Sequence, residues 1–171
     1  CLIKKKNNNY SNIKKEDSKL ISLQLLNKLE KTPTLYYYEL CNLKNEYTPE
    51  VISKIINDIS NTYIYNGNHL HALIYIVGDL YYEDSKQKNI YGTKITVSED
   101  IGIKILEKLI EYNIDLYSEN YYNETPLQNL SAEGFTRRKN NTQFKKKLQQ
   151  YYIDDLNKTL PLESVKTKLI V

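Results

Sequence analysis

Apolar residues along this chain recur three or four positions apart in seven separate stretches. That spacing places them on one face of a helix, whereas a half-buried strand would alternate at every second position. The pattern predicts helices over about 19–30, 35–43, 49–59, 69–80, 98–112, 126–132 and 143–156. The first carries Leu20, Leu23, Leu26 and Leu29 on one stripe, and no stretch alternates convincingly. The predicted fold class is therefore all-α.

Several helix ends are marked by capping residues and turn formers. Thr48 before Pro49, and Ser98 before two acidic residues, have the side chains that accept from free N–H groups at a helix start. The pair Thr32-Pro33 predicts a break between the first two helices. Asn66-Gly67 predicts a turn before the helix that starts at His69.

The chain of 171 residues is long enough for one domain with a hydrophobic core. Residues 1–16 are rich in Lys and Asn and are expected to form a disordered polar tether. Residues 17–157 are expected to be the folded domain. Residues 158–171 are expected to form a C-terminal segment that caps its apolar edge.

The stretch from Ile105 to Leu127 contains an amphipathic helix, the turn Asn113-Ile114-Asp115, a polar link and the helix start Thr125-Pro126-Leu127-Gln128. This order resembles the ankyrin repeat, including that of viral or intracellular-bacterial proteins, in which an apolar helix precedes Gly-Ala-Asp and Thr-Pro-Leu-His. Asp115 precedes Leu127 by 12 residues, which is the family's spacing. Asn113 stands for the turn glycine, since Asn also adopts the left-handed conformation.

A second match to the motif is Asn68-His69-Leu70-His71, with His69 in place of Pro. Leu70 and Leu127 are 57 residues apart, 24 more than the ~33 of one ankyrin unit, and the excess falls at an insertion over 81–97. Upstream, the isoleucine-rich stretch 51–56 matches the second helix of an earlier repeat, with the Thr32-Pro33 helix as its partner. The resemblance thus implies an ankyrin-type helical solenoid of about three to four degenerate repeats. Departures from the family pattern include Asn123 for the finger glycine and Gln128 for the second His, so the repeat count stays open.

Candidate chemistry is sparse. His69 and His71 face different directions on a helix and are not a metal pair, and the resemblance makes His71 a structural residue. Cys1 and Cys41 have no metal-ligand spacing, and Cys41 is expected to be buried. The pair Asp154-Asp155 is expected to be a solvated helix face. The sequence therefore predicts no enzyme, catalytic residue, metal or cofactor.

Charge and hydropathy exclude two classes of partner. The net charge is only +3, from 24 basic and 21 acidic residues, so no nucleic acid is expected. No apolar run approaches the ~18 residues of a membrane span. Tyrosine is abundant, with 17 residues, and suits interfaces because it gives large contact area and a polar tip.

The resemblance implies a non-catalytic module, expected to be monomeric and cytoplasmic in its own or a host cell, that binds a protein of unknown identity. Ankyrin repeats bind through their finger tips and the concave face of their first helices. By register, these positions are Tyr65, Tyr75, Tyr122, Glu124 and Glu133.

Two alternatives stay open. The stretch from Leu160-Pro161 onward faintly resembles an F-box-like helix, which would make the chain an adaptor that recruits a target to a ubiquitin ligase. A leading Cys1 before a polar tether would also suit a surface lipoprotein anchored through that cysteine.

Overall fold

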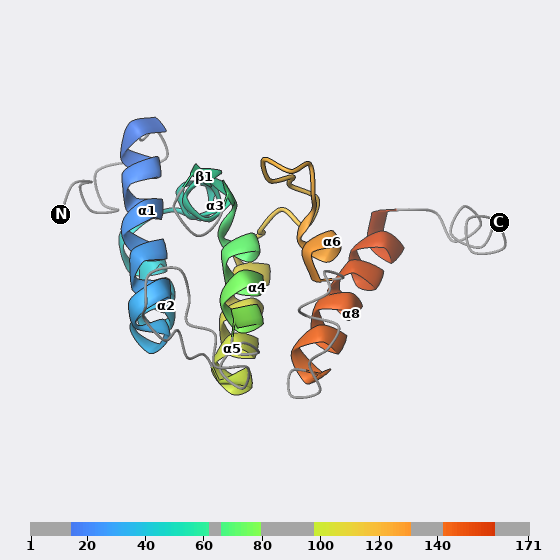
Figure 1. Ribbon diagram of the computed structural model, residues 1–171. Helices are drawn as coiled ribbons and strands as arrows, with labels where there is room; N and C mark the ends of the chain where they lie inside the picture. Colours follow the sequence, from blue (N-terminus) through green and yellow to red (C-terminus); the bar gives the residue numbers. More distant parts are fainter. Residues whose placement is uncertain (1–14, 62–65, 80–97, 131–141, 160–171) are drawn as a thin grey trace, which may run out of the picture.

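The computed structural model describes residues 15–61, 66–79, 98–130 and 142–159 (Figure 1). In these ranges the chain is mostly helical, and the predicted all-α class is confirmed. The helices are α1 (Lys15–Lys31), α2 (Pro33–Glu46), α3 (Pro49–Asn57), α4 (His69–Asp79), α5 (Glu99–Glu111), α6 (Pro126–Leu130) and α8 (Thr142–Thr159). One antiparallel pair of two-residue strands, β1 (Ser60–Asn61) and β2 (Asn66–Gly67), was not predicted. Residues 1–14 of the expected tether, the insertion over 81–97 and most of the C-terminal segment lie outside the described residues. The last two residues of the expected tether, Lys15 and Glu16, instead form the start of α1.

The helices form two layers (Figure 1). Three pairs pack face to face, namely α1 with α2, α4 with α5, and α6 with α8. One layer is built by α4, which contacts both α1 and α6, and the other by α5, which contacts both α2 and α8. Each amphipathic helix thus buries its apolar face against its own partner and against the next pair.

The sequence signals for helix ends act as predicted. The hydroxyl of Thr48 accepts from the Val51 N–H at 3.4 Å, and that of Ser98 accepts from the Ile101 N–H at 3.3 Å. Thr32 separates α1 from α2, although its side chain makes no capping hydrogen bond. After α5 the chain turns at Asn113, whose φ of 62° is left-handed.

The core is one continuous apolar cluster between the layers. Its largest fully buried side chains are Tyr36, Phe144, Leu26, Leu29, Leu40, Ile52, Ile55, Ile56, Leu70, Leu73, Ile76 and Ile105. Gly102 lets α5 approach its neighbours closely, since an added Cβ there would lie 3.0 Å from Cγ2 of Val77 and 3.6 Å from Cδ2 of Phe144.

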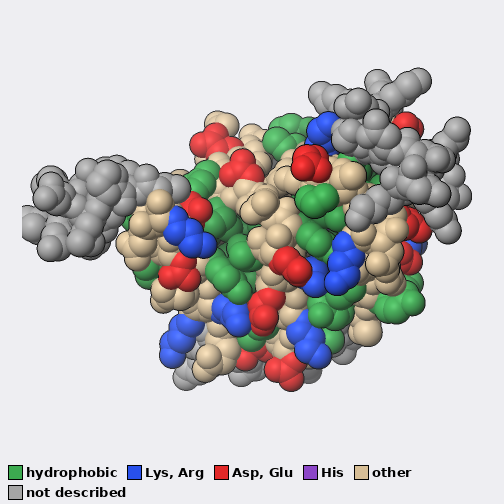
Figure 2. All heavy atoms as spheres, turned by 180° about the vertical axis from the view of Figure 1, so that it is seen from behind, with side chains coloured by type: hydrophobic (Ala, Val, Ile, Leu, Met, Phe, Trp, Pro, Cys, Tyr) green, Lys and Arg blue, Asp and Glu red, His purple; other side chains and the backbone are tan. Residues whose placement is uncertain are grey.

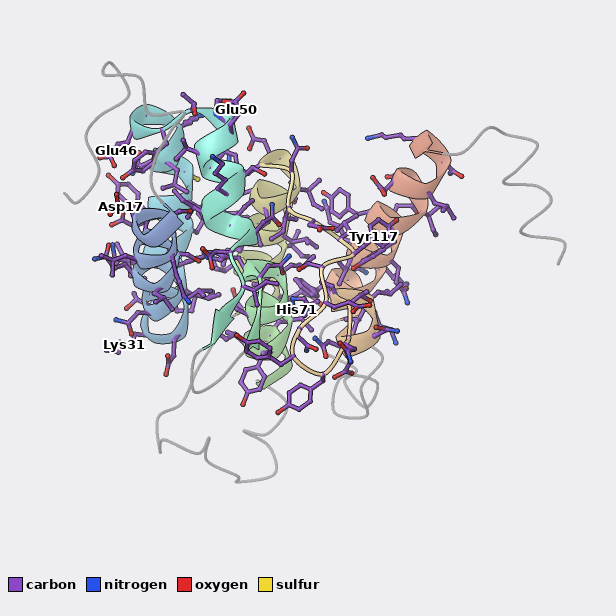
Figure 3. The ribbon with its side chains drawn as sticks, turned by 90° about the horizontal axis from the view of Figure 1, so that it is seen from above. Asp17, Lys31, Glu46, Glu50, His71 and Tyr117 are labelled. Carbon is purple, nitrogen blue, oxygen red and sulfur yellow. The ribbon has the colours of Figure 1, made fainter. Side chains whose placement is uncertain are left out.

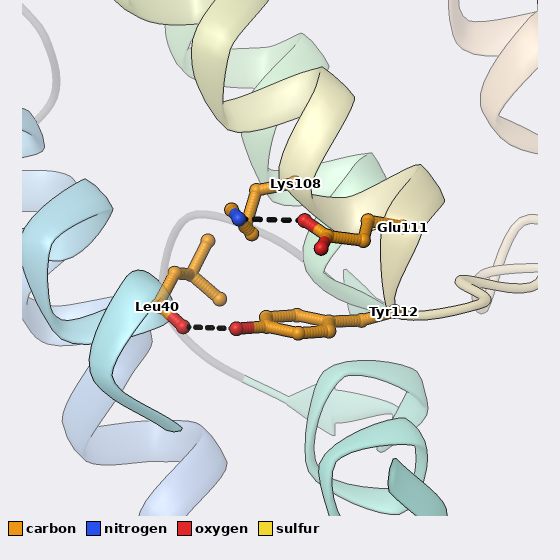
Figure 4. Close-up of polar contacts among 4 residues, drawn as sticks. All are labelled: Leu40, Lys108, Glu111 and Tyr112. Carbon is orange, nitrogen blue, oxygen red and sulfur yellow. Dashed lines mark hydrogen bonds and ion pairs between the residues drawn. The ribbon is translucent and has the colours of Figure 1, made fainter. Parts of the chain in front are cut away.

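A tyrosine joins α2 to the end of α5 (Figure 4). The hydroxyl of Tyr112 donates to the Leu40 carbonyl at 2.7 Å, from a residue 72 positions along the chain. Lys108 lies over the Tyr112 ring, 5.7 Å from its centroid, and pairs with Glu111 at 2.6 Å. The Tyr112 hydroxyl thus gives the Leu40 carbonyl of α2 a hydrogen-bond donor from the neighbouring helix of the same layer.

Three features of the packing could not be read from the sequence. The helix beside α5 in its layer is α2, whereas α3, which contains the isoleucine-rich stretch 51–56, packs on α1 and α2. Apolar periodicity shows that a helix has a buried face but not which helix covers it. Leu127 is only partly buried, because α6 is the last helix of its layer among the described residues. Cys41 is half-exposed rather than buried.

The register of α5 gives a stability prediction. Leu109 is fully buried, so Leu109→Ala should lower the free energy of unfolding by about 2–5 kcal/mol, because it removes apolar contacts and leaves a cavity. Leu127→Ala should cost less because that side chain is partly exposed. Leu20→Ala is the control, since Leu20 is 40% exposed. Urea unfolding of the three variants measures the order, and equal losses would contradict this packing.

Candidate interaction surface

The start of α4 is closed by two residues that cap each other. The Asn68 side-chain oxygen accepts from the N–H groups of Leu70 and His71, at 3.1 and 3.2 Å. In return, Nδ1 of His71 accepts from the Asn68 N–H at 3.2 Å. The capping asparagine and the histidine three residues later therefore satisfy each other's backbone groups, as in a capping box.

The same histidine, labelled in Figure 3, also contacts the loop that leads into α6, the next helix of its layer. Nε2 of His71 lies 2.9 Å from the carbonyl oxygen of Glu124, directly before the start of α6. A carbonyl can only accept, so Nε2 carries the proton and Nδ1 is the bare nitrogen that the Asn68 N–H requires. Burial lowers the pKa of His71, which keeps the ring in this neutral form.

Helix α6 begins with the corresponding arrangement. The Thr125 N–H donates to the side-chain oxygen of Gln128 at 2.7 Å, and the Gln128 N–H donates to the Thr125 hydroxyl at 3.3 Å. Thr125 and Gln128 thus have the roles of Asn68 and His71, at the positions that the sequence motif pairs. Gln128 is exposed, and no bond from it to a further helix is seen within the described ranges.

A second set of polar contacts fixes the turn after α5. The side-chain amide of Asn57, at the end of α3, donates to the Asn113 carbonyl at 3.2 Å, and its oxygen accepts from the Asp115 N–H at 2.7 Å. The Asn68 amide donates to the Asp115 carbonyl at 3.0 Å. Two asparagine side chains, those of Asn57 and Asn68, therefore hold the turn after α5 against the end of α3 and the start of α4.

The loop between α5 and α6 projects a tight turn. The side-chain oxygen of Asn120 accepts hydrogen bonds from the N–H groups of Tyr122 and Glu124, at 2.9 and 3.0 Å. Asn123 has a left-handed φ of 58°, the conformation that glycine adopts most readily. The two asparagines predicted to replace glycines, Asn113 and Asn123, are the only non-glycine residues with positive φ in the described part of the chain.

The structure describes three of the five predicted contact residues. Tyr122 is 72% exposed at the turn of the loop, and Tyr75 is 41% exposed on α4. Tyr75 lies one turn after His71 on the same side of α4, and His71 contacts Glu124, two residues beyond Tyr122. The two tyrosines therefore lie on the two elements that this contact joins. Glu124 is half-buried and contributes its carbonyl to His71. Tyr65 and Glu133 lie outside the described residues.

Two further exposed tyrosines of this loop were not predicted. Tyr121 is 58% exposed beside Tyr122, and Tyr117 is 50% exposed. The adjacent pair Tyr121-Tyr122 in a polar loop is a sequence signal that could have included Tyr121. No feature of the neighbouring sequence singles out Tyr117, because the side chains that contact it belong to α8.

His69 is a buried polar link between helices. Its Nε2 lies 2.8 Å from the Ser22 hydroxyl of α1, and its Nδ1 lies 2.8 Å from the Tyr36 hydroxyl of α2. A neutral imidazole has one donor and one acceptor, so one hydroxyl accepts while the other donates. Complete burial lowers the pKa of His69 to about 3. This fully buried Ser-His-Tyr group therefore links α4 to α1 and α2.

Comparison with protein-family models, with curated proteins and with solved structures finds no match. Among the described residues, no three His, Cys, Asp or Glu side chains converge as a metal ion would require. None of the helices in those ranges has both the length and the hydropathy needed to cross a bilayer. The candidate interaction surface is formed by Tyr75, Tyr121 and Tyr122, on two elements that the His71–Glu124 hydrogen bond joins.

The His71 contact gives a matched pair of variants. His71→Gln gives the start of α4 the residue type that α6 has at Gln128. A glutamine there can accept from the Asn68 N–H, but it cannot also donate to the Glu124 carbonyl. Losing that bridge leaves a polar group without its partner and should cost about 1–3 kcal/mol of unfolding free energy. The control Gln128→His should be nearly neutral because position 128 is exposed. Chemical denaturation compares them; a neutral His71→Gln would exclude the bridge.

Both histidines predict a dependence of stability on pH. Each has a lowered pKa in the folded protein, so between pH 6.5 and 3 the unfolded chain binds more protons. Stability is therefore complete above pH 6.5 and falls as the pH is lowered through this window. His69 alone should cost about 2 kcal/mol between pH 6.5 and 5, at ~1.36 kcal/mol per pH unit.

Urea unfolding at pH 7.5, 6.5 and 5.0 measures this loss of stability. These pH values lie above the range in which most carboxylates titrate. His71→Gln should reduce the slope and leave the His69 contribution in place. Equal stability at pH 7.5 and 5.0 would show that the histidines are not buried as neutral groups.

Proposed function

We propose that this chain is a non-catalytic protein–protein interaction module of the ankyrin-repeat type. Its helix pairs would be degenerate repeats, and its partner would be a protein that contacts the exposed tyrosines of α4 and of the loop before α6. The observation that carries the proposal is the exposure of Tyr75 and Tyr122 beside the His71–Glu124 contact, which fixes the two elements relative to each other.

Four features support the repeat type. Helices α4 and α6 lie in one layer and α5 and α8 in the other, as successive repeats require. The motif residues at 68–71 and at 125–128 make corresponding capping contacts. His71 joins one such motif to the next. Asn113 and Asn123 adopt left-handed conformations where the family has glycine.

The surface chemistry favours a protein partner. Tyrosine and other aromatic residues are enriched at interfaces because they give large contact area at low entropic cost. A rigid loop and a helix lower that cost further, since little ordering is needed on binding. On the face drawn in Figure 2, acidic and basic side chains are interspersed with hydrophobic ones, and no broad basic stripe of the kind that binds nucleic acid is visible there.

The double variant Tyr75→Ala/Tyr122→Ala tests the proposal. Both side chains are exposed, so the fold should be retained. Capture of a specific partner from the native source should weaken about tenfold or more, because aromatic interface anchors contribute roughly 2 kcal/mol each. The measurement is quantitative affinity capture with wild type and variant in parallel.

The matched control is Leu35→Ala/Tyr38→Ala on α2, which removes side chains that are 40% and 64% exposed. It should bind like wild type. Recovery of every specific partner at the same level by both double variants would refute this surface as the binding site.

A further inference from the structure

A groove of about 400 Å³ lies between the end of α5, the turn that follows it and the last turns of α8. Its apolar walls are Ile110, Ile114 and the rings of Tyr117 and Tyr151. The groove is open on one side and has the size of small-molecule and peptide side-chain sites, which begin at ~300 Å³. It uses neither Tyr75 nor Tyr122.

Carboxylates from two separate parts of the chain line the groove. Asp115 comes from the turn after α5, and Asp154 and Asp155 come from α8; Lys158 is the one cation of the lining. The local charge is thus negative on a chain whose net charge is +3. Acidic character is therefore a property of this groove rather than of the whole molecule.

The carboxylates Asp115 and Asp154 retain acceptor capacity. Oδ1 of Asp115 accepts from the Tyr117 N–H at 2.8 Å, and Oδ1 of Asp154 accepts from the Gln150 amide at 2.8 Å. A carboxylate has two oxygens and about four acceptor positions, so one such bond leaves room for a further donor. No three carboxylates in the described residues converge as metal ligands do, which favours an extended organic cation over a metal ion.

One aromatic wall is held in place before anything binds. The Tyr117 ring packs edge-on against Tyr152, with centroids 5.6 Å apart at 86°, and its hydroxyl donates to Asp155 at 3.0 Å. Tyr152 is itself fixed by donating to the Leu116 carbonyl. Burial raises the pKa of Tyr117 and Tyr151, so both rings stay neutral and present uncharged faces to a cation.

We propose that this groove binds an arginine side chain of a protein partner. The guanidinium is planar, stacks on aromatic rings and donates through five N–H groups, so it matches tyrosine walls with carboxylates at their rim. The aliphatic part of the arginine would cover the isoleucines of the groove. This proposal rests on the proposed function only in that the partner is a protein. It adds that the partner's contacting segment is positively charged.

The test is a titration of the ¹⁵N-labelled full chain with acetyl-Ala-Arg-Ala-amide, whose only charge is the guanidinium. Saturable chemical-shift changes are expected at amides of 110–117 and 151–158. The same peptide with citrulline in place of arginine keeps the shape and removes the charge, and it should not saturate. Equal titration by both peptides, or no saturable change with the arginine peptide, would overturn the proposal.

Two substitutions with equal change of charge decide where the cation binds. Asp154→Asn removes an exposed groove carboxylate and should weaken the arginine peptide about three- to tenfold. Glu50→Gln removes an exposed carboxylate on α3, distant from Tyr117 in Figure 3, and should leave binding unchanged. Equal weakening by both would mean unspecific attraction and reject the groove. Because Tyr75 and Tyr122 remain in all these proteins, partner capture through them can succeed or fail independently.

Discussion

The arrangement of the described chain depends on a neutral, buried histidine that has two hydrogen-bonding duties. His71 accepts from the Asn68 N–H and donates to the Glu124 carbonyl, so it both closes the start of α4 and fixes the loop that leads into α6. Only the tautomer with the proton on Nε2 can do both. The position of the tyrosine-bearing loop relative to α4 follows from that bond, and so does the proposed interaction surface.

Polar groups between neighbouring helices and turns are satisfied by residues distant in sequence. Asn57 joins the turn after α5, Asn68 reaches Asp115, and His69 links α1 to α2 through Ser22 and Tyr36. Leaving such groups without partners would cost about 1–3 kcal/mol each. The hydrophobic core holds the layers together non-directionally, whereas these directional bonds define how one helix pair sits on the next.

The two proposed surfaces differ in chemistry and rest on the same loop. Its turn presents Tyr121 and Tyr122, and its beginning supplies Asp115 and Tyr117 to the groove against α8. A partner that spans both would meet aromatic area on one side and negative charge on the other. Tyr117 belongs to the groove alone, where its contacts with Tyr152 and Asp155 hold it in place.

Local sequence determined the helices and their ends. Apolar spacing, Thr48, Ser98 and the pair Thr32-Pro33 act within a few residues, so they could be read without the fold. The match between residues 68–71 and 125–128 likewise paired two motifs that make corresponding capping contacts. Tertiary structure alone decided that α2 rather than α3 lies beside α5, that Leu127 is only partly buried, and that Asp154-Asp155 lines a groove rather than a plain solvated face. These outcomes depend on which surfaces meet across dozens of residues, and a hydrophobic or charged face carries no mark of the partner that will cover it.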